Sequence, residues 1–77
     1  MTVTVRLHGE PSRYLGTGSD MAQLEVGEGA TVHSVLTGLG LPEREYWLLA
    51  VNGHVARPHD TLRDGDLLEC VAPMSGG

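Results

Sequence analysis

Residues 47–56, WLLAVNGHVA, are the stretch that decides how this chain folds. The run over residues 47–51 is apolar and β-prone. Asn52-Gly53 follows it and is the strongest hairpin signal that a short sequence offers, because both residue types tolerate the positive φ of a type I′ turn. Residues 54–56 supply the return strand, so the stretch predicts an antiparallel hairpin.

A second turn and a last strand follow this hairpin. Leu62 can fill a core position, and Asp64-Gly65 favours a tight turn. Residues 67–72 then alternate with period two, which predicts a strand ended by a proline. Its inward residues are expected to be Leu68 and Cys70.

The first part of the chain predicts a second hairpin. Residues 2–7 and 21–26 each alternate between polar and apolar residues, and a loop rich in glycine, proline and serine separates them. The residues expected to face the core are Val3, Val5, Leu7, Ala22, Leu24 and Val26.

One short helix separates the two hairpins. Thr31 offers a hydroxyl that can cap the first turn, and two glycines and Pro42 end the helix after about two turns. Its apolar stripe consists of Val32, Val35, Leu36 and Leu39. The order β-β-α-β-β-β therefore predicts a small α+β domain with the helix on one face of a mixed sheet.

Composition limits the classes of function. The 77 residues suffice for one domain. Its free energy of unfolding should be about 4–12 kcal/mol, so little stability is available to offset the strain of an internal active site. The formal charge of −5 and the lack of a basic stretch argue against nucleic-acid binding and suit basic protein partners. No run approaches the roughly 18 apolar residues of a membrane span, and no signal peptide is visible, so we expect a cytoplasmic protein.

Residues that could bind metal or attack a substrate do not form a recognisable group. Cys70 is expected to point inward and to act as a small apolar residue, and Asp64 and Asp66 serve the turn around Gly65. The histidines show no metal-ligand spacing, so we expect no metal site and no catalytic residues. These histidines are His8, His33, His54 and His59.

Three pieces of the sequence, taken together, resemble the sulfur-carrier branch of the ubiquitin superfamily, which includes the small subunit of molybdopterin synthase (MoaD) and the thiamine-biosynthesis carrier (ThiS). The pieces are Val51-Asn52-Gly53, the LRDGD run at residues 62–66, and Ala72-Pro73-Met74-Ser75-Gly76-Gly77. The resemblance covers essentially the whole chain. It implies a β-grasp fold, five strands with one main helix, over residues 1–72 and a flexible tail over residues 73–77.

Within this branch the ending is closer to the molybdopterin type, because Pro73 stands four residues before Gly77. That type usually carries aromatic residues before its prolines, whereas Cys70-Val71-Ala72 stands here. Carriers for cysteine or natural-product biosynthesis share the same ending. The pathway that receives the sulfur therefore stays open.

The resemblance also implies the chemistry and the partners. A ubiquitin-activating-type adenylyltransferase would use ATP to adenylate the carboxylate of Gly77, which would then become a thiocarboxylate that donates sulfur. The chain would bind no cofactor itself. The other partners would be a sulfur donor, such as a cysteine desulfurase or a rhodanese-like protein, and a sulfur-accepting synthase large subunit or its equivalent. The residues expected to thread into a partner are Pro73, Met74, Ser75 and Gly76.

A docking face is predicted by the alternation in the third and last strands. If Leu49, Val51, Leu68 and Cys70 face the core, the residues between them lie on the opposite face of the sheet. Apolar residues gathered on one exposed face suggest a partner site, and the resemblance implies that the activating enzyme binds there. The predicted docking residues are Leu48, Ala50, Leu67 and Val71.

Two other functions stay open. A ubiquitin-like modifier would use the same activation and become attached through Gly77 to lysines of other proteins. The chain contains no lysine, which excludes lysine-linked chains of itself. The second alternative is a β-grasp interaction module that carries out no acyl chemistry.

Overall fold

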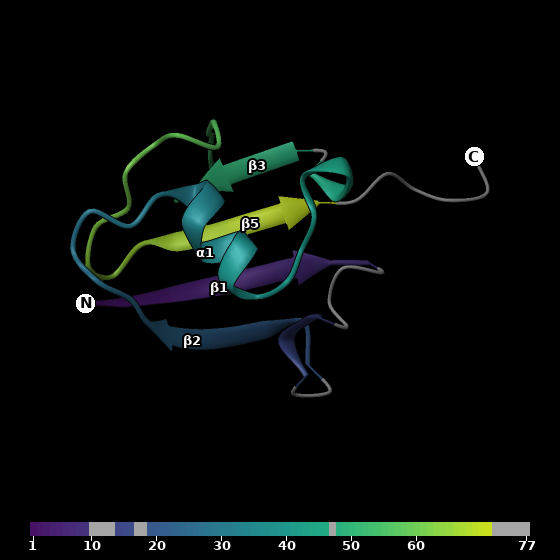
Figure 1. The fold of residues 1–77 in the computed structure, drawn as a ribbon, viewed down its shortest axis with the longest axis horizontal. Helices are drawn as coiled ribbons and strands as arrows, with labels where there is room; N and C mark the ends of the chain where they lie inside the picture. The colour runs from purple at the N-terminus through teal and green to yellow at the C-terminus, as the bar shows by residue number, and fades with distance from the viewer. Residues whose placement is uncertain (10–13, 17–18, 47, 72–77) are drawn as a thin grey trace.

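Five strands and one principal helix form the part of the chain that the computed structural model describes, residues 1–9, 14–16, 19–46 and 48–71 (Figure 1). The strands form one sheet in the order β2-β1-β5-β3-β4. They are β1 (Thr2–His8), β2 (Met21–Glu25), β3 (Leu48–Val51), β4 (His54–Val55) and β5 (Leu67–Val71). The helical segments are the α-helix α1 (Val32–Gly38) and the 3-10 helix η2 (Glu43–Glu45).

Strand β5 lies between the two hairpins, β1–β2 and β3–β4, and joins them. Strand β1 pairs antiparallel with β2, where Val3 lies opposite Leu24, and parallel with β5, where Val5 lies opposite Leu68. Strand β3 pairs antiparallel with both β5 and β4. The sheet is therefore mixed, and the predicted α+β architecture of the β-grasp type is confirmed.

Two turns set the strand pairing. Asn52 and Gly53 have φ values of 53° and 84°, the geometry of a type I′ hairpin turn, as predicted. At the second turn, Asp64 Oδ1 accepts a hydrogen bond from the main-chain N–H of Thr2 at 2.7 Å. The N–H of Gly65 donates to the carbonyl oxygen of Thr2 at 2.8 Å. The turn before β5 is thus tied to the start of β1, where the parallel pair begins.

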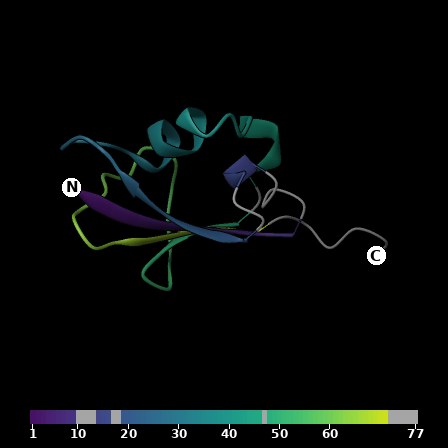
Figure 2. The ribbon, with the colours of Figure 1, turned by 90° about the horizontal axis from the view of Figure 1, so that it is seen from below.

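Helix α1 begins at the predicted cap residue, Thr31. Its hydroxyl accepts a hydrogen bond from the N–H of Ser34 at 3.1 Å, and Ser34 Oγ accepts one from the N–H of Thr31 at 2.9 Å. This reciprocal capping box satisfies main-chain donors that a helix start leaves without partners. Gly40 follows the helix with a φ of 86°, which favours glycine. Helix α1 and η2 lie on the same face of the sheet (Figure 2).

The core lies between this helical layer and the sheet. The inward residues predicted for β1, α1 and β5 are buried, apart from Leu39, which is half-buried at the edge. Leu41 joins the core without a sequence signal, because the chain folds back after α1 and the N–H of Leu41 donates to the carbonyl oxygen of Leu36 at 3.0 Å. The buried residues are Val3, Val5, Leu7, Val32, Val35, Leu36, Leu41, Leu49, Leu62, Leu68 and Cys70.

Replacing Leu36 or Leu68 by alanine is expected to lower the free energy of unfolding by about 2–4 kcal/mol, because both side chains are fully buried and each truncation leaves a cavity. Urea denaturation followed by circular dichroism measures the change. Leu48→Ala is the matched control, and at an exposed leucine the loss should stay below about 1 kcal/mol. A negligible loss at both buried sites would mean that the inner face has been assigned to the wrong residues.

Candidate functional site

The predicted reactive tail follows β5. Gly77, which is expected to carry the sulfur, lies outside the described residues, as does the whole segment 72–77 with Pro73, Met74, Ser75 and Gly76. The predicted boundary between domain and tail, after residue 72, lies there too. The structure describes β5 as far as Val71, so the described part of the site is the sheet face around this residue.

Figure 2 shows that α1 covers one face of the sheet and leaves the opposite face uncovered. Alternation with buried neighbours in β3 and β5 directs the predicted docking residues to this uncovered face. Leu48 is 46% exposed, and the other three predicted residues are half-buried. Of the residues predicted to face the core, Leu49, Leu68 and Cys70 are buried, and Val51 is half-buried and packs against the core. We call this surface the outer patch, and it consists of Leu48, Ala50, Leu67 and Val71. Its docking role stays a prediction.

Strand pairing determines the shape of the outer patch. Val71 lies opposite Leu48, so two apolar side chains of β5 and β3 are direct neighbours across the sheet. Ala50 lies opposite Glu69, which stands between Leu67 and Val71 on β5. The apolar residues of the outer patch therefore surround a carboxylate.

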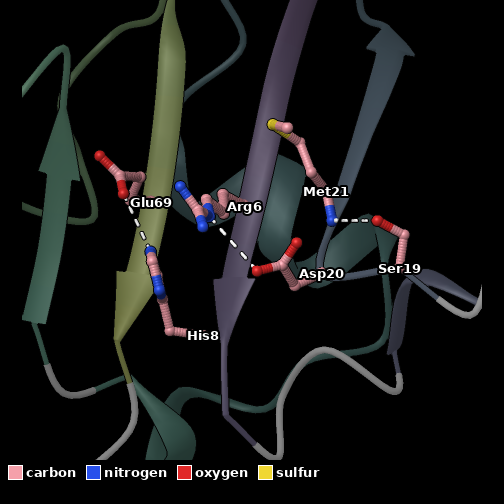
Figure 3. Close-up of polar contacts among 6 residues, drawn as sticks. All are labelled: Arg6, His8, Ser19, Asp20, Met21 and Glu69. Atoms are coloured by element: carbon pink, nitrogen blue, oxygen red, sulfur yellow. Dashed lines mark hydrogen bonds and ion pairs between the residues drawn. The ribbon is translucent and has the colours of Figure 1, made fainter.

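Glu69 is paired with a histidine from β1. Its Oε2 atom lies 2.9 Å from Nε2 of His8, and the two side chains are 23% and 32% exposed (Figure 3). Arg6, also on β1, places its Nε atom 3.3 Å from Oδ2 of Asp20. A protein that covers the outer patch would also cover the half-buried pair of His8 and Glu69. Its surface would have to match this polar centre as well as the apolar residues around it.

The sequence predicted the face on which Glu69 lies but not its partner. Alternation places Glu69 on the same face as Leu67 and Val71, and the same rule places His8 on the outer face of β1. Their contact depends on the parallel pairing of β1 with β5, in which His8 lies opposite Val71 and Arg6 opposite Glu69. No local sequence signal encodes this register.

The other candidate residues serve the fold. Cys70 is buried, as predicted. Asp66 accepts hydrogen bonds at 2.8 Å from the N–H of Arg63 and from Nδ2 of Asn52. It therefore stabilises both the turn at Gly65 and the turn at Asn52-Gly53, in agreement with its predicted structural role. In the described ranges, no three side chains of histidine, cysteine, aspartate or glutamate group as a metal site would require. No helix in that part of the chain is long and apolar enough to cross a membrane.

A second polar cluster joins η2 to α1, on the side of the sheet that carries the helices. Nδ1 of His33 lies 3.2 Å from Oε1 of Glu43 and 3.4 Å from the hydroxyl of Tyr46. Burial raises the pKa of Tyr46 above its usual value, Thr37 lowers it through a hydrogen bond, and the charge of Glu43 raises it again. The phenol therefore stays neutral at physiological pH. Tyr46 also packs against the core, so this cluster has a structural role.

Comparison with known proteins identifies the family. The model of the ThiS family matches residues 5–77. The structure of SAMP1 from Haloferax volcanii is similar with a TM-score of 0.79 at 23% identity, over all of both chains. A putative molybdopterin converting factor, subunit 1, from Pyrococcus furiosus gives 0.73 at 23% identity, over 96% of this chain and 99% of its own. No curated protein sequence is significantly similar to the chain.

A further similar structure is a chain of the complex between subunits 1 and 2 of molybdopterin-converting factor from Helicobacter pylori 26695. Its TM-score is 0.63 at 20% identity, over all of both chains. At these identities the structures show a common fold, which agrees with the mixed sheet and single principal helix found here. The family model covers nearly the whole sequence, and the resemblance found in the sequence is thereby confirmed. The chain belongs to the ThiS family, among the ubiquitin-like sulfur carriers of the MoaD/ThiS type.

Proposed function

We propose that this chain is a sulfur carrier whose Gly77 carboxylate is adenylated by a partner enzyme and converted to a thiocarboxylate. The observation that carries the proposal is the match to the ThiS family over residues 5–77. The chain serves as a protein co-substrate, and the partners hold the catalytic groups. The molybdopterin pathway is favoured, because Pro73 precedes the Gly-Gly ending and molybdopterin converting factor subunits share the fold.

The proposed chemistry uses only the main chain of the tail. The Gly77 carboxylate, ionised at neutral pH, attacks the α-phosphate of ATP and displaces pyrophosphate. A persulfide of the sulfur donor then attacks the acyl carbon and displaces AMP, which gives an acyl disulfide. A thiol next attacks the donor's sulfur atom in this acyl disulfide, so a disulfide forms between the thiol and the donor and the thiocarboxylate leaves. Glycine at positions 76 and 77 leaves no Cβ near these reacting atoms.

The outer patch is the surface on which we expect the activating enzyme to dock. Leu48 and Val71 provide neighbouring apolar side chains, and β5 leads directly into the tail. Residues 73–77 extend about 17 Å at about 3.3 Å per residue, which suffices to reach a site buried in the partner. A sulfur-accepting large subunit would use the same tail, and the similar Helicobacter pylori chain is described in complex with a second subunit.

A second function, protein modification through Gly77, is favoured by one observation. The chain shares its fold with small archaeal modifier protein 1 of Haloferax volcanii, with a TM-score of 0.76 at 21% identity. Activation would be the same, but the acyl group would pass to a lysine of another protein. The chain contains no lysine, so it would add single copies to its targets rather than lysine-linked chains.

Intact mass measurement of the protein from its own host separates these functions. We expect a fraction of the molecules to show the replacement of one oxygen by sulfur, and this fraction should disappear in a strain that lacks the activating enzyme. Covalent adducts with other proteins, without any sulfur-containing form, would support the modifier instead. If the host contains the activating enzyme and neither product forms, the chain is an interaction module and the sulfur-carrier proposal is wrong.

A further inference from the structure

The turn at Asn52-Gly53 leaves the N–H of Gly53 without a partner among the described residues. In a two-residue hairpin turn the hydrogen bonds join the flanking residues, here Val51 and His54. No described group accepts a hydrogen bond from the N–H of Gly53, and both turn residues are exposed. The nitrogen of Gly53 is therefore open to solvent directly beside the side-chain amide of Asn52.

Two hydrogen bonds hold the side-chain amide of Asn52. Its Nδ2 atom donates to Oδ1 of Asp66 at 2.8 Å, and its Oδ1 atom accepts from the N–H of Leu67 at 2.9 Å. We call Asn52, Asp66 and Leu67 the Asn52 clasp. Leu67 begins β5, and the N–H of Thr4 on β1 donates to the carbonyl oxygen of Asp66 at 2.9 Å. The Asn52 clasp therefore connects the β3–β4 hairpin with the start of the parallel strand pair.

The turn at Asp64-Gly65 offers a comparison within the same chain. Aspartate before glycine can form the same cyclic imide as asparagine before glycine, because glycine has no Cβ atom to hinder ring closure. At this turn the N–H of Gly65 donates to the carbonyl oxygen of Thr2 at 2.8 Å, and Asp64 Oδ1 accepts from the N–H of Thr2 at 2.7 Å. Both reacting groups are thus bonded to β1, whereas Gly53 has no such bond in the described part of the chain.

We infer that Asn52 is a site of spontaneous, irreversible modification and that the Asn52 clasp controls its rate. The nitrogen of Gly53, after losing its proton to the solvent, attacks Cγ of Asn52. A bond forms between these two atoms, the bond from Cγ to Nδ2 breaks, and the nitrogen leaves as ammonia with a proton from water. A water molecule then opens the cyclic imide at either carbonyl, which gives aspartate or isoaspartate.

The attack requires the side chain of Asn52 to leave the Asn52 clasp. Cγ has to turn toward the nitrogen of Gly53, so the hydrogen bonds to Asp66 and Leu67 break first. A hydrogen bond to a charged acceptor contributes more than one between neutral groups, so the carboxylate of Asp66 supplies most of the protection. Asp66 is therefore a positioning residue that slows the reaction.

Either product disrupts the Asn52 clasp. Aspartate at position 52 replaces the donor Nδ2 by an oxygen, which would lie 2.8 Å from Oδ1 of Asp66, and two carboxylates at this separation repel. Isoaspartate in addition inserts a methylene group into the main chain and lengthens the two-residue turn. This turn lies where β5 begins, whereas the tail follows its other end (Figure 1). The modification therefore lowers the stability of the domain and leaves Gly77 unchanged.

Intact mass measurement during incubation in a mildly alkaline buffer tests the site. Wild type should gain the mass that the replacement of an NH group by oxygen adds, and peptide mapping should find aspartate and isoaspartate at position 52. The sequence has two side-chain amides, Asn52 and Gln23, so the gain can be assigned. Asn52→Gly removes one of them and keeps the turn, because Gly-Gly also favours type I′, and this variant should show no gain.

Asp66→Ala should raise the rate of this mass gain at least about tenfold, because the charged acceptor of Asn52 is lost. Asp60→Ala is the matched control. Asp60 Oδ2 accepts from the N–H of Arg57 at 3.0 Å, and Asp66 Oδ2 accepts in the same way from the N–H of Arg63 at 2.8 Å. Asp60 forms no hydrogen bond with Asn52, so Asp60→Ala should react at the wild-type rate.

Val35→Ala separates local opening of the Asn52 clasp from unfolding of the whole domain. It removes a core contact on α1 and leaves all three residues of the Asn52 clasp in place. Because the reaction needs only local opening, Val35→Ala should react within about twofold of the wild-type rate.

The effect on stability is measured on a variant that carries one of the two products. Asn52→Asp should lower the melting temperature by about 4–8 °C, because a hydrogen bond is lost and two carboxylates are brought together. Gln23→Glu makes the same change of amide to carboxylate at the exposed edge of β2 and should leave the melting temperature nearly unchanged.

The inference is wrong if Asn52→Gly gains mass at the wild-type rate, since another group would then be reacting. It is also wrong if Asp66→Ala reacts no faster than Asp60→Ala, or if Val35→Ala reacts as fast as Asp66→Ala. An unchanged melting temperature of Asn52→Asp would refute the effect on stability. These measurements use neither the activating enzyme nor Gly77, so a failure here leaves the sulfur-carrier proposal unaffected.

Discussion

Appending one residue after Gly77 is expected to abolish ATP-dependent activation of the chain and to leave its melting temperature unchanged. The reacting group in the proposed mechanism is the Gly77 carboxylate, and an appended residue converts it into an amide that cannot attack ATP. Deleting Gly77 leaves a carboxylate but withdraws it by about 3.3 Å. A displacement of even about 1 Å can cost about a hundredfold in rate, so the truncated chain should also be inactive. A bulky residue at position 77 should fail because its Cβ crowds the acyl carbon.

Pyrophosphate exchange with the activating enzyme of the host measures this loss, and a melting curve is recorded for each variant. The matched control is an extended chain whose added residues are removed after Gly77 by a site-specific protease, and activity should return on cleavage. Normal exchange by the uncleaved, extended chain would refute the carrier function. The β-grasp interaction module would then be the better account of this protein.

Introducing glutamate at Leu67 or Val71 is expected to weaken binding to the activating enzyme about 30-fold or more. The new carboxylate would be desolvated in the apolar part of the proposed interface, where the loss of a central contact typically costs about 2 kcal/mol or more. Alternation with the buried Leu68 and Cys70 places both residues on the sheet face opposite α1, so the domain should remain folded. Leu48→Glu is the variant least expected to disturb folding, because Leu48 is already 46% exposed. Its effect on binding should follow that of Val71, its direct neighbour across the sheet.

Isothermal titration with the activating enzyme, together with thermal denaturation, checks this prediction. Gln23→Glu is the control, because it adds the same charge to β2 at the edge of the sheet, outside the outer patch. A collapse of stability would mean that Leu67 and Val71 contribute to the core. Unchanged folding together with unchanged adenylation would mean that the enzyme docks on another surface.

The sequence by itself determined the elements of the fold and which side of each element is buried. Alternation in residues 2–7 and 67–72 predicted the burial of Val3, Val5, Leu7, Leu68 and Cys70, and the structure confirms it. Asn52-Gly53 predicted a type I′ turn, and Thr31 predicted the start of α1. These features could be predicted because side-chain period, turn geometry and helix capping depend on residues close together in the chain. The four residues of the outer patch were predicted for the same reason.

Only the tertiary structure decided which distant residues meet. The pair of His8 and Glu69 at the centre of the outer patch spans 61 positions of the sequence and depends on the register between β1 and β5. Leu41 enters the core only because the chain folds back after α1. Strand register and strand order depend on how all the elements pack together around one core. A local sequence pattern does not determine either of them.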